Sequence, residues 1–479
     1  MENEIRILKH ILALCFLMAL VNLAKAEVKL PAFFADNMVL QQQRKVKFWG
    51  FSSGRKEITV KTSWDNHTYK AKADSAGNWQ VFLLTPSAGG PYQISIKQEN
   101  KIQLNNVLIG EVWICSGQSN MDMPVKGYDN LPILNSSDIL LGSPNPSIRL
   151  FHVERQYGSE AKKDVKGSWQ QADASSVNSF SAVGYQFASI LQKYLGIPVG
   201  IIQTTWGGSP IEAWIEKAAV QSLLKERLAT NKSIRNTVHQ TPGNLFNGMV
   251  APLIGYHIAG VIWYQGEQNR FEPSDYLALQ LTMVNLWRNR WNIGDWPFYL
   301  VQLAPMHYSK QEAPMVPLLR EAQLKLVDTL SNSGVAIAID AGEEFNIHPP
   351  NKTIIAKRLA NMALVKTYKK DGLASEGPKY DGMLVKNDTV HVKFSKIPLG
   401  IISYGKKITQ FEVAGADRVF YPASASIRNK EVVVYSKDVK NPVAVRYAFR
   451  DWCIGELYST EGLPASSFRS DNWVLDNRR

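Results

Sequence analysis

The chain has 479 residues, of which 45% are hydrophobic and 20% are charged. This length exceeds that of one ordinary domain, and the composition is that of a globular protein. The net charge of +12 is spread along the sequence, with no basic run interleaved with aromatic residues, so we expect no nucleic-acid surface.

The amino-terminal segment has the pattern of a secretory signal peptide. Residues 11–23 form an apolar run that is too short to span a bilayer, and an Ala-Lys-Ala cleavage sequence follows at 24–26. We therefore expect residues 1–26 to be removed and the mature chain to be periplasmic or secreted. No later segment reaches eighteen unbroken apolar residues, so we expect no membrane contact after cleavage. Only Cys115 and Cys453 then remain, and we expect both to be buried without a disulfide framework.

The spacing of apolar residues predicts three domains in the mature chain. Over 27–106, short alternating runs separated by turn residues predict a β-sandwich-like domain. Over 107–376, apolar strands alternate with helical patterns, which predicts a parallel sheet covered by helices on both faces. Short strands return over 377–479 and predict a second β-rich module. The central strands are expected at 107–115, 199–204, 259–264, 298–303 and 334–339, and the central helices at 184–194, 211–228, 275–289, 318–330 and 352–368.

A candidate nucleophile follows the first central strand. The Gly-Gln-Ser-Asn sequence at 117–120 is a small-residue turn that presents Ser119. Ligands of such sheets bind at the carboxyl ends of the strands. A serine hydroxyl attacks an ester only with a nearby base and with donors for the developing oxyanion. A serine after a strand is more often a turn residue or a helix cap, so the motif needs support from other segments.

The second central strand is followed by a Trp-Gly-Gly-Ser sequence. Ser209 and Glu212 have the spacing of a capping box, which predicts the start of a helix. Gly207 and Gly208 precede that start, and a backbone N–H of either could donate to an oxyanion. The alternative is a tight turn that binds nothing.

The third central strand leads into Gln-Gly-Glu-Gln-Asn at 265–269. The side-chain amides of Gln265 and Asn269 could donate to an oxyanion or to sugar hydroxyls. Ordinary loop capping is the alternative, in which Glu267 would be a structural acid.

One of the eight histidines is a candidate base. His348 lies in a loop after the last central strand, with acidic residues just ahead of it, and can reach across the top of the sheet. No cluster of His, Cys or carboxylates has zinc-like spacing, so we infer no metal and no cofactor.

These four segments, in this order, resemble the sialate O-acetylesterase branch of the SGNH hydrolases. The resemblance extends to residues 34–41 and 461–469. It implies an α/β, SGNH-type three-layer hydrolase domain between β-sandwich-like modules. It also implies that Ser119 is the nucleophile and His348 the general base. The oxyanion and substrate-positioning residues would be Gly207, Gly208, Gln265 and Asn269.

The sequence departs from the family at the third member of the catalytic triad. The family commonly has Asp two or three residues before the histidine, where this chain has Phe345 and Asn346. The imidazole could be oriented by an amide, as in Cys-His-Asn proteases, or by a nearby carboxylate, or the site could be a Ser-His dyad. The candidates for this role are Asn346, Glu344, Glu343 and Asp340.

The expected function is that of a serine esterase that removes O-acetyl groups from sugars, with 9-O-acetyl sialic acid as the first candidate substrate. Acetyl xylan or another acetylated polysaccharide is the alternative, because the residues of the ester chemistry do not specify the sugar. A non-catalytic carbohydrate-binding protein is a third reading, which the missing Asp allows. The expected partner is an O-acetylated glycan, and the oligomeric state stays open.

Overall fold

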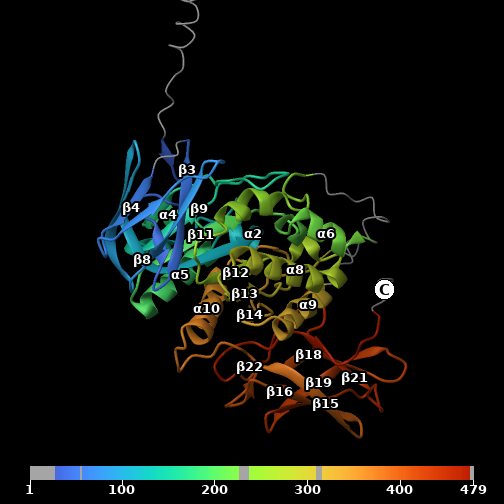
Figure 1. The fold of residues 1–479 in the computed structure, drawn as a ribbon. Coiled ribbons are helices and arrows are strands. Elements are labelled where there is room, and N and C mark those ends of the chain that lie inside the picture. Colours follow the sequence, from blue (N-terminus) through green and yellow to red (C-terminus); the bar gives the residue numbers. More distant parts are fainter. Residues whose placement is uncertain (1–26, 54–56, 226–236, 309–315, 475–479) are drawn as a thin grey trace, which may run out of the picture.

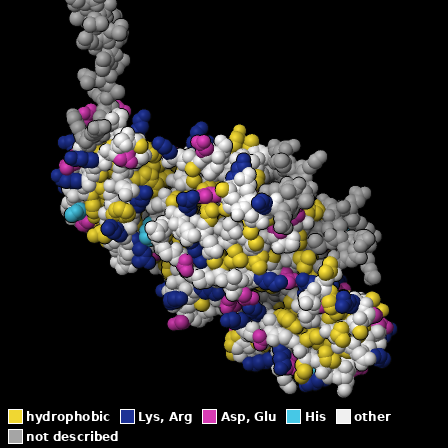
Figure 2. Space-filling model, turned by 45° about the vertical axis from the view of Figure 1, so that its right-hand side comes forward, with side chains coloured by type: hydrophobic (Ala, Val, Ile, Leu, Met, Phe, Trp, Pro, Cys, Tyr) yellow, Lys and Arg dark blue, Asp and Glu magenta, His cyan; other side chains and the backbone are white. Residues whose placement is uncertain are grey.

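The computed structural model describes residues 27–53, 57–225, 237–308 and 316–474, so the expected signal peptide lies outside the described residues. Within these ranges, no helix is both long and apolar enough to cross a membrane. Lys and Arg side chains are interspersed with acidic ones over the face shown in Figure 2, without gathering into one basic patch.

The amino-terminal module consists of short strands whose side chains alternate between buried and exposed, as the sequence pattern predicts. One three-stranded sheet has the order β1-β3-β6, and strands β2, β4, β5 and β7 belong to the sheet that contains β8. The bounds are β1 Val28–Lys29, β2 Val39–Gln41, β3 Lys45–Ser52, β4 Ile58–Thr62, β5 Thr68–Ala71, β6 Asn78–Leu84, β7 Gly89–Lys97 and β8 Lys101–Gly117.

Strand β8 connects this module to the centre of the molecule. It runs without interruption for 17 residues, so it crosses the expected domain boundary between residues 106 and 107. Its first half pairs with β7 in antiparallel register, and its second half lies between β11 and β12 in parallel register. The two modules therefore share one backbone hydrogen-bonded sheet.

The central sheet is parallel from β9 to β14, in the order β9-β11-β8-β12-β13-β14, and β10 adds an antiparallel edge. The strands expected in this sheet are all present. Strand β9 and the edge strand β10 were not expected, because their sequence lacks a continuous apolar run. The bounds are β9 Asn145–His152, β10 Trp169–Ala172, β11 Val199–Thr205, β12 Gly260–Tyr264, β13 Phe298–Val301 and β14 Ser333–Ala336.

Helices cover both faces of this sheet (Figure 1). Alternate residues of β12 enter two separate apolar cores: Trp263 packs into one with Trp287 of α8, and Ile262 packs into the other with Leu359 of α10. These are the two faces of a three-layer arrangement. The covering helices are α5 Ala182–Leu195, α8 Pro273–Trp291, α9 Val316–Thr329 and α10 Lys352–Met362, and a π-helical turn, η5 Ala363–Thr367, extends α10.

The helix expected over 211–228 is wrong in its first part. The chain forms a short 3-10 helix, η1 Ile211–Trp214, becomes extended at Ile215, and then forms helix α6 Lys217–Leu223. Ser209 does not cap this helix, because its hydroxyl donates to the Trp206 carbonyl and accepts from the Trp214 indole. Residues 226–228 lie outside the described ranges.

Further short helices and helical turns lie in the connections between the strands of the central sheet. Helix α2 Ser119–Asp122 follows β8 directly, and α3 and α4 lie between β8 and α5. Their bounds, with those of the remaining short turns, are α3 Ser136–Leu141, α4 Ala174–Asn178, η2 Phe246–Val250, η3 Ala251–Leu253 and η4 Glu267–Asn269.

The carboxyl-terminal module is a separate antiparallel sheet with the order β15-β16-β20-β19-β18-β21-β23, accompanied by the pair β17-β22. Its apolar side chains form a third core that also takes in Ile337 and Ile339, which follow β14. The module therefore packs against the end of the α/β domain that lies near β14 (Figure 1). The bounds are β15 Lys379–Lys386, β16 Thr389–Ser395, β17 Ile401–Ile402, β18 Ile408–Ala414, β19 Phe420–Arg428, β20 Glu431–Tyr435, β21 Ala444–Tyr447, β22 Tyr458–Ser459 and β23 Phe468–Arg469.

The turn between β8 and α2 requires glycine. Gly117 has φ of +134°, and a Cβ at this position would lie 2.2 Å from the Tyr264 carbonyl oxygen of β12. That carbonyl accepts the Gln118 N–H, and the Gly117 carbonyl accepts the Trp206 N–H. The chain can therefore leave the sheet here only if residue 117 has no side chain.

We expect Gly117→Ala to lower the free energy of unfolding by about 3 kcal/mol or more, because a strained dihedral and a backbone clash add together. The matched control is Gly372→Ala: Gly372 has φ of +79° but nothing within 4 Å of its would-be Cβ. It should lose only about 1 kcal/mol. Urea unfolding of both variants checks this, and equal losses would show that the contact with Tyr264 has no cost.

Candidate active site

The ends of β8, β11 and β14 bring the expected catalytic residues to one pocket of about 370 Å³. Ser119 is the first residue of α2, Gly207 and Gly208 follow β11, and His348 lies in the loop after β14. All four line the pocket. Its other lining residues are Gln118, Asp122, Tyr128, Arg155, Glu267, Gln268, Arg270 and Ile347.

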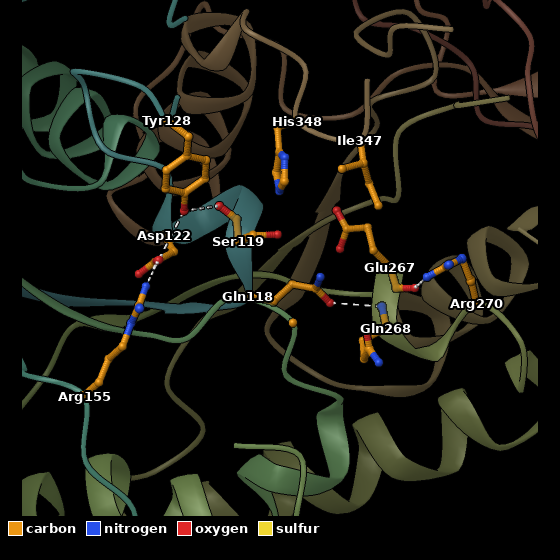
Figure 3. A pocket seen from close by; sticks show the side chains of 12 residues that line it. Gln118, Ser119, Asp122, Tyr128, Arg155, Glu267, Gln268, Arg270, Ile347 and His348 are labelled. Carbon is orange, nitrogen blue, oxygen red and sulfur yellow. Dashed lines mark hydrogen bonds and ion pairs between the residues drawn. The ribbon is translucent and has the colours of Figure 1, made fainter. Parts of the chain in front are cut away.

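Ser119 and His348 face one another across this pocket (Figure 3). The imidazole packs edge-to-face against Tyr128, with ring centroids 5.5 Å apart. Neither imidazole nitrogen has a hydrogen-bond partner among the described residues. Burial, and to a lesser extent the charge of Lys352, lowers the pKa of His348 from 6.5 to about 4. At neutral pH the imidazole is therefore uncharged and able to accept a proton.

Gly207 lies directly beside the nucleophile, since a Cβ on it would be 3.4 Å from the Ser119 Cβ. In the described part of the chain, no backbone or side-chain group accepts the N–H of Gly207 or Gly208. The Ser119 N–H lies at the start of α2, where it has no intrahelical acceptor. These donors can therefore stabilise negative charge that forms next to Ser119. The pair of glycines precedes only the four-residue η1, so no long helix dipole assists them.

Gln265 and Asn269 do not line the pocket, contrary to the expectation from sequence. Both are fully buried. The Gln265 amide donates to the Ser209 carbonyl and to Asn269 Oδ1, while the Asn269 amide donates to Glu212 and its oxygen accepts the Ile211 N–H. These side chains satisfy buried polar groups of the turn after β11, and they hold that turn against the end of β12.

None of the four candidates for orienting His348 contacts its imidazole. Asp340 forms a bidentate ion pair with Arg358, with both distances 2.7 Å. Asn346 accepts the backbone N–H of His348 at 2.9 Å and donates to Glu343, which is exposed. Glu344 is also exposed. The loop therefore orients His348 through its backbone.

Asp122, Tyr128 and Arg155 form one wall of the pocket (Figure 3). The buried Asp122 carboxylate accepts from Arg155 at 2.6 Å, from the Tyr128 hydroxyl at 3.2 Å and from Thr205. Asp122 lies two residues after the Gly-Gln-Ser-Asn sequence, at the end of α2, and this nearness to the motif is its signal in the sequence. Tyr128 and Arg155 lie in segments without any recognisable motif, so only the fold brings them here.

Gln118 and Arg270 belong to the opposite side. The Gln118 side-chain oxygen accepts the backbone N–H groups of Gly266 and Gln268, which joins the nucleophile turn to the loop after β12. Arg270 donates to the Glu267 carbonyl. The pocket lining therefore contains two acidic side chains, Asp122 and Glu267, and two basic ones, Arg155 and Arg270.

The chain is similar to known carbohydrate esterases. Residues 109–364 match the family described as carbohydrate esterase, sialic acid-specific acetylesterase. The sialate O-acetylesterase of Rattus norvegicus is 28% identical over 76% of this chain and 79% of its own length, and that of Homo sapiens is 26% identical over 88% of both. A carbohydrate acetylesterase of Xanthomonas citri has a solved structure that covers 93% of this chain and 100% of its own, with 32% identity and a TM-score of 0.84. The chain therefore belongs to the sialic acid-specific acetylesterase family of carbohydrate esterases and is a carboxylic-ester hydrolase that acts on sugar O-acetyl groups.

Proposed function

We propose that this protein is an exported serine esterase with an SGNH-type hydrolase domain, and that it deacetylates O-acetylated sialic acid, with the 9-O-acetyl ester as the first candidate. The observation that carries the mechanism is the shared pocket of Ser119, His348 and Gly207. A nucleophile, an uncharged base and an unused N–H donor converge there, which is the minimum required for acyl transfer.

The proposed reaction has two steps. The Ser119 hydroxyl attacks the acetyl carbonyl while His348 takes its proton, and the N–H groups of Ser119 and Gly207 bind the oxyanion. His348 then returns the proton to the departing sugar oxygen, which leaves acetyl-Ser119. Water, deprotonated by His348, attacks this ester, and acetate departs with regeneration of the serine.

We expect Ser119→Ala to abolish acetate release from O-acetylated sialic acid, because Ser119 is the only serine, threonine or cysteine among the described residues that line the pocket. Release should be measured in parallel from acetylated xylan. Loss of activity in the variant with sialic acid preferred supports the proposal, and a preference for xylan would move the substrate to plant polysaccharides. No release by the wild-type protein from either substrate would favour the non-catalytic binding protein instead.

The pH dependence should report the depressed basicity of His348. Only the neutral imidazole accepts a proton, and burial lowers the pKa of His348 to about 4, so it is neutral above that pH. We expect kcat/KM to stay constant from neutral pH to about pH 5 and to fall as the pH drops through about 4. A pH profile with p-nitrophenyl acetate checks this, and an acid limb near the ordinary histidine value of 6.5 would contradict it.

Arg155 supports sialic acid as the substrate. Its side chain is 50% exposed, and within the described ranges its hydrogen bonding is to Asp122 through a single nitrogen, Nη2. A guanidinium with free donors at the edge of an ester-cleaving pocket suits a substrate that carries a carboxylate. Acetylated xylan is the second candidate, because the four charged side chains of the pocket balance and the Xanthomonas citri relative is described only as a carbohydrate acetylesterase.

We expect Arg155→Gln to raise KM for O-acetylated sialic acid about tenfold or more, since a charge-assisted hydrogen bond contributes about 1.5–3 kcal/mol. KM for a neutral acetylated xylo-oligosaccharide should change little. Arg290→Gln is the matched control, because Arg290 is 57% exposed and also pairs with one acid, Glu216, outside the pocket. Equal effects of Arg155→Gln on both substrates would remove the argument for a carboxylate.

A further inference from the structure

Three segments of the sequence meet at the side chain of Asn120, immediately after the nucleophile. The Asn120 amide nitrogen donates to a Glu267 carboxylate oxygen and, at 2.9 Å, to the backbone carbonyl of Ile347. The Asn120 oxygen accepts from the Lys352 ammonium at 2.5 Å. Asn120 therefore connects the helix that begins at Ser119 with the turn after β12 and with the loop that carries His348.

The charged partners determine which way the Asn120 amide is oriented. A charged lysine can only donate and an ionised glutamate can only accept, so with both groups charged the Asn120 oxygen faces Lys352 and its nitrogen faces Glu267. This orientation leaves the second amide N–H for Ile347. A flipped amide would break all three hydrogen bonds at once.

The network is buried, so these contacts are not exchanged for water. Asn120 and Lys352 are each 1% exposed and Glu267 is 3% exposed. Burial raises the pKa of Glu267, and it lowers the pKa of Lys352 to about 7 although Glu267 opposes that shift. Two opposite charges on either side of one amide compensate each other, whereas either alone would be costly here.

His348 needs this support because its imidazole has no hydrogen-bond partner in the part of the chain that the structure describes. In a Ser-His-Asp triad, the acid binds the imidazole and fixes its direction. Here the peptide group that joins Ile347 to His348 is held at both of its polar atoms: Asn346 accepts the His348 N–H, and Asn120 donates to the Ile347 carbonyl. Of these two, only Asn120 also belongs to the element that carries the nucleophile.

We propose that Asn120 is a positioning residue that sets the geometry between Ser119 and His348 by holding the Ile347 carbonyl, in place of an acid bound to the imidazole. This inference rests on the proposed function, since it assigns a role within the Ser119 and His348 mechanism. Glu267 and Lys352 act through Asn120 by fixing the orientation of its amide.

The test exchanges the amide and the acid. Asn120→Asp places two carboxylates together at positions 120 and 267 and leaves Ile347 without a donor. The double variant Asn120→Asp with Glu267→Gln restores a donor opposite an acceptor at these positions, keeps an oxygen for Lys352 and keeps the net charge. It still lacks a donor for the Ile347 carbonyl.

We expect the single variant to lose both thermal stability and activity. The double variant should recover the unfolding temperature of the wild-type protein but keep kcat reduced by about 10- to 100-fold, with KM for p-nitrophenyl acetate unchanged within about twofold. Recovery of kcat together with stability would overturn the inference and leave Asn120 a purely structural residue. If the double variant does not fold, Asn120→Ala decides: a folded protein whose kcat stays within about threefold of the wild-type value also overturns it.

Wild-type protein and Ser119→Ala are assayed alongside these variants. An inactive wild-type protein, or an active Ser119→Ala protein, would mean that the proposed function has failed. A wild-type protein that is active, a Ser119→Ala protein that is inactive and a double variant with wild-type kcat would mean that only the role of Asn120 has failed.

Discussion

The position of Ser119 depends on the close approach of two strands at the end of β8. The chain has no room for a side chain at Gly117, because the Tyr264 carbonyl of β12 occupies that space and accepts the next N–H. On the other side of β8, the Gly117 carbonyl accepts the N–H of Trp206, which follows β11. Both neighbouring strands thus fix the turn by backbone hydrogen bonds, and Gly207 is placed so close to Ser119 that a Cβ on it would lie 3.4 Å from the Ser119 Cβ.

The polar side chains behind the pocket divide into two groups with different tasks. Gln265 and Asn269 satisfy the backbone and acid of the turn after β11, and Gln118 satisfies two N–H groups of the turn after β12. These contacts hold the turns that form the pocket walls; Gln265 and Asn269 do so from behind the pocket, whereas Gln118 also lines it. Asn120 with Glu267 and Lys352 differs, because it reaches a loop that starts three strands away and so connects the helix of Ser119 with the loop of His348.

The carboxyl-terminal module contributes to the site at a distance. The buried guanidinium of Arg320 in α9 donates to the Leu303 carbonyl after β13 and to the Arg450 and Asp451 carbonyls of the module. Ile337 and Ile339, which begin the loop that carries His348, lie in the core of this module. The module therefore holds the loops after β13 and β14, and through the second of these loops it helps to place His348. None of its described residues lines the pocket.

Apolar periodicity in the sequence was enough to predict five strands of the central sheet and four of the five expected helices, and the positions of Ser119, Gly207 and His348 after such strands indicated that they would lie at the same end of the sheet. Periodicity follows from burial on two faces, which is a local property of each segment. The motifs could not show which hydrogen-bond partners their polar side chains would have. Gln265 and Asn269 were expected in the pocket because they follow a strand. Their side chains instead form hydrogen bonds with the backbone of the turn after β11, which is distant in the sequence but close in space.

The surroundings of the His348 imidazole show the same difference between what the sequence reveals and what the tertiary structure adds. The sequence by itself determined that Asp is missing before His348 and that Asp340, Glu343, Glu344 and Asn346 were the nearby alternatives. Only the tertiary structure decided that Asp340 pairs with Arg358 and that Asn346 accepts a backbone N–H. It also brings Asn120, Glu267 and Lys352, from three distant segments, together beside Ile347. The physical reason is that a buried polar group forms hydrogen bonds with the polar groups nearest to it in space. The order of the strands in the sheet, rather than separation along the chain, determines which groups those are.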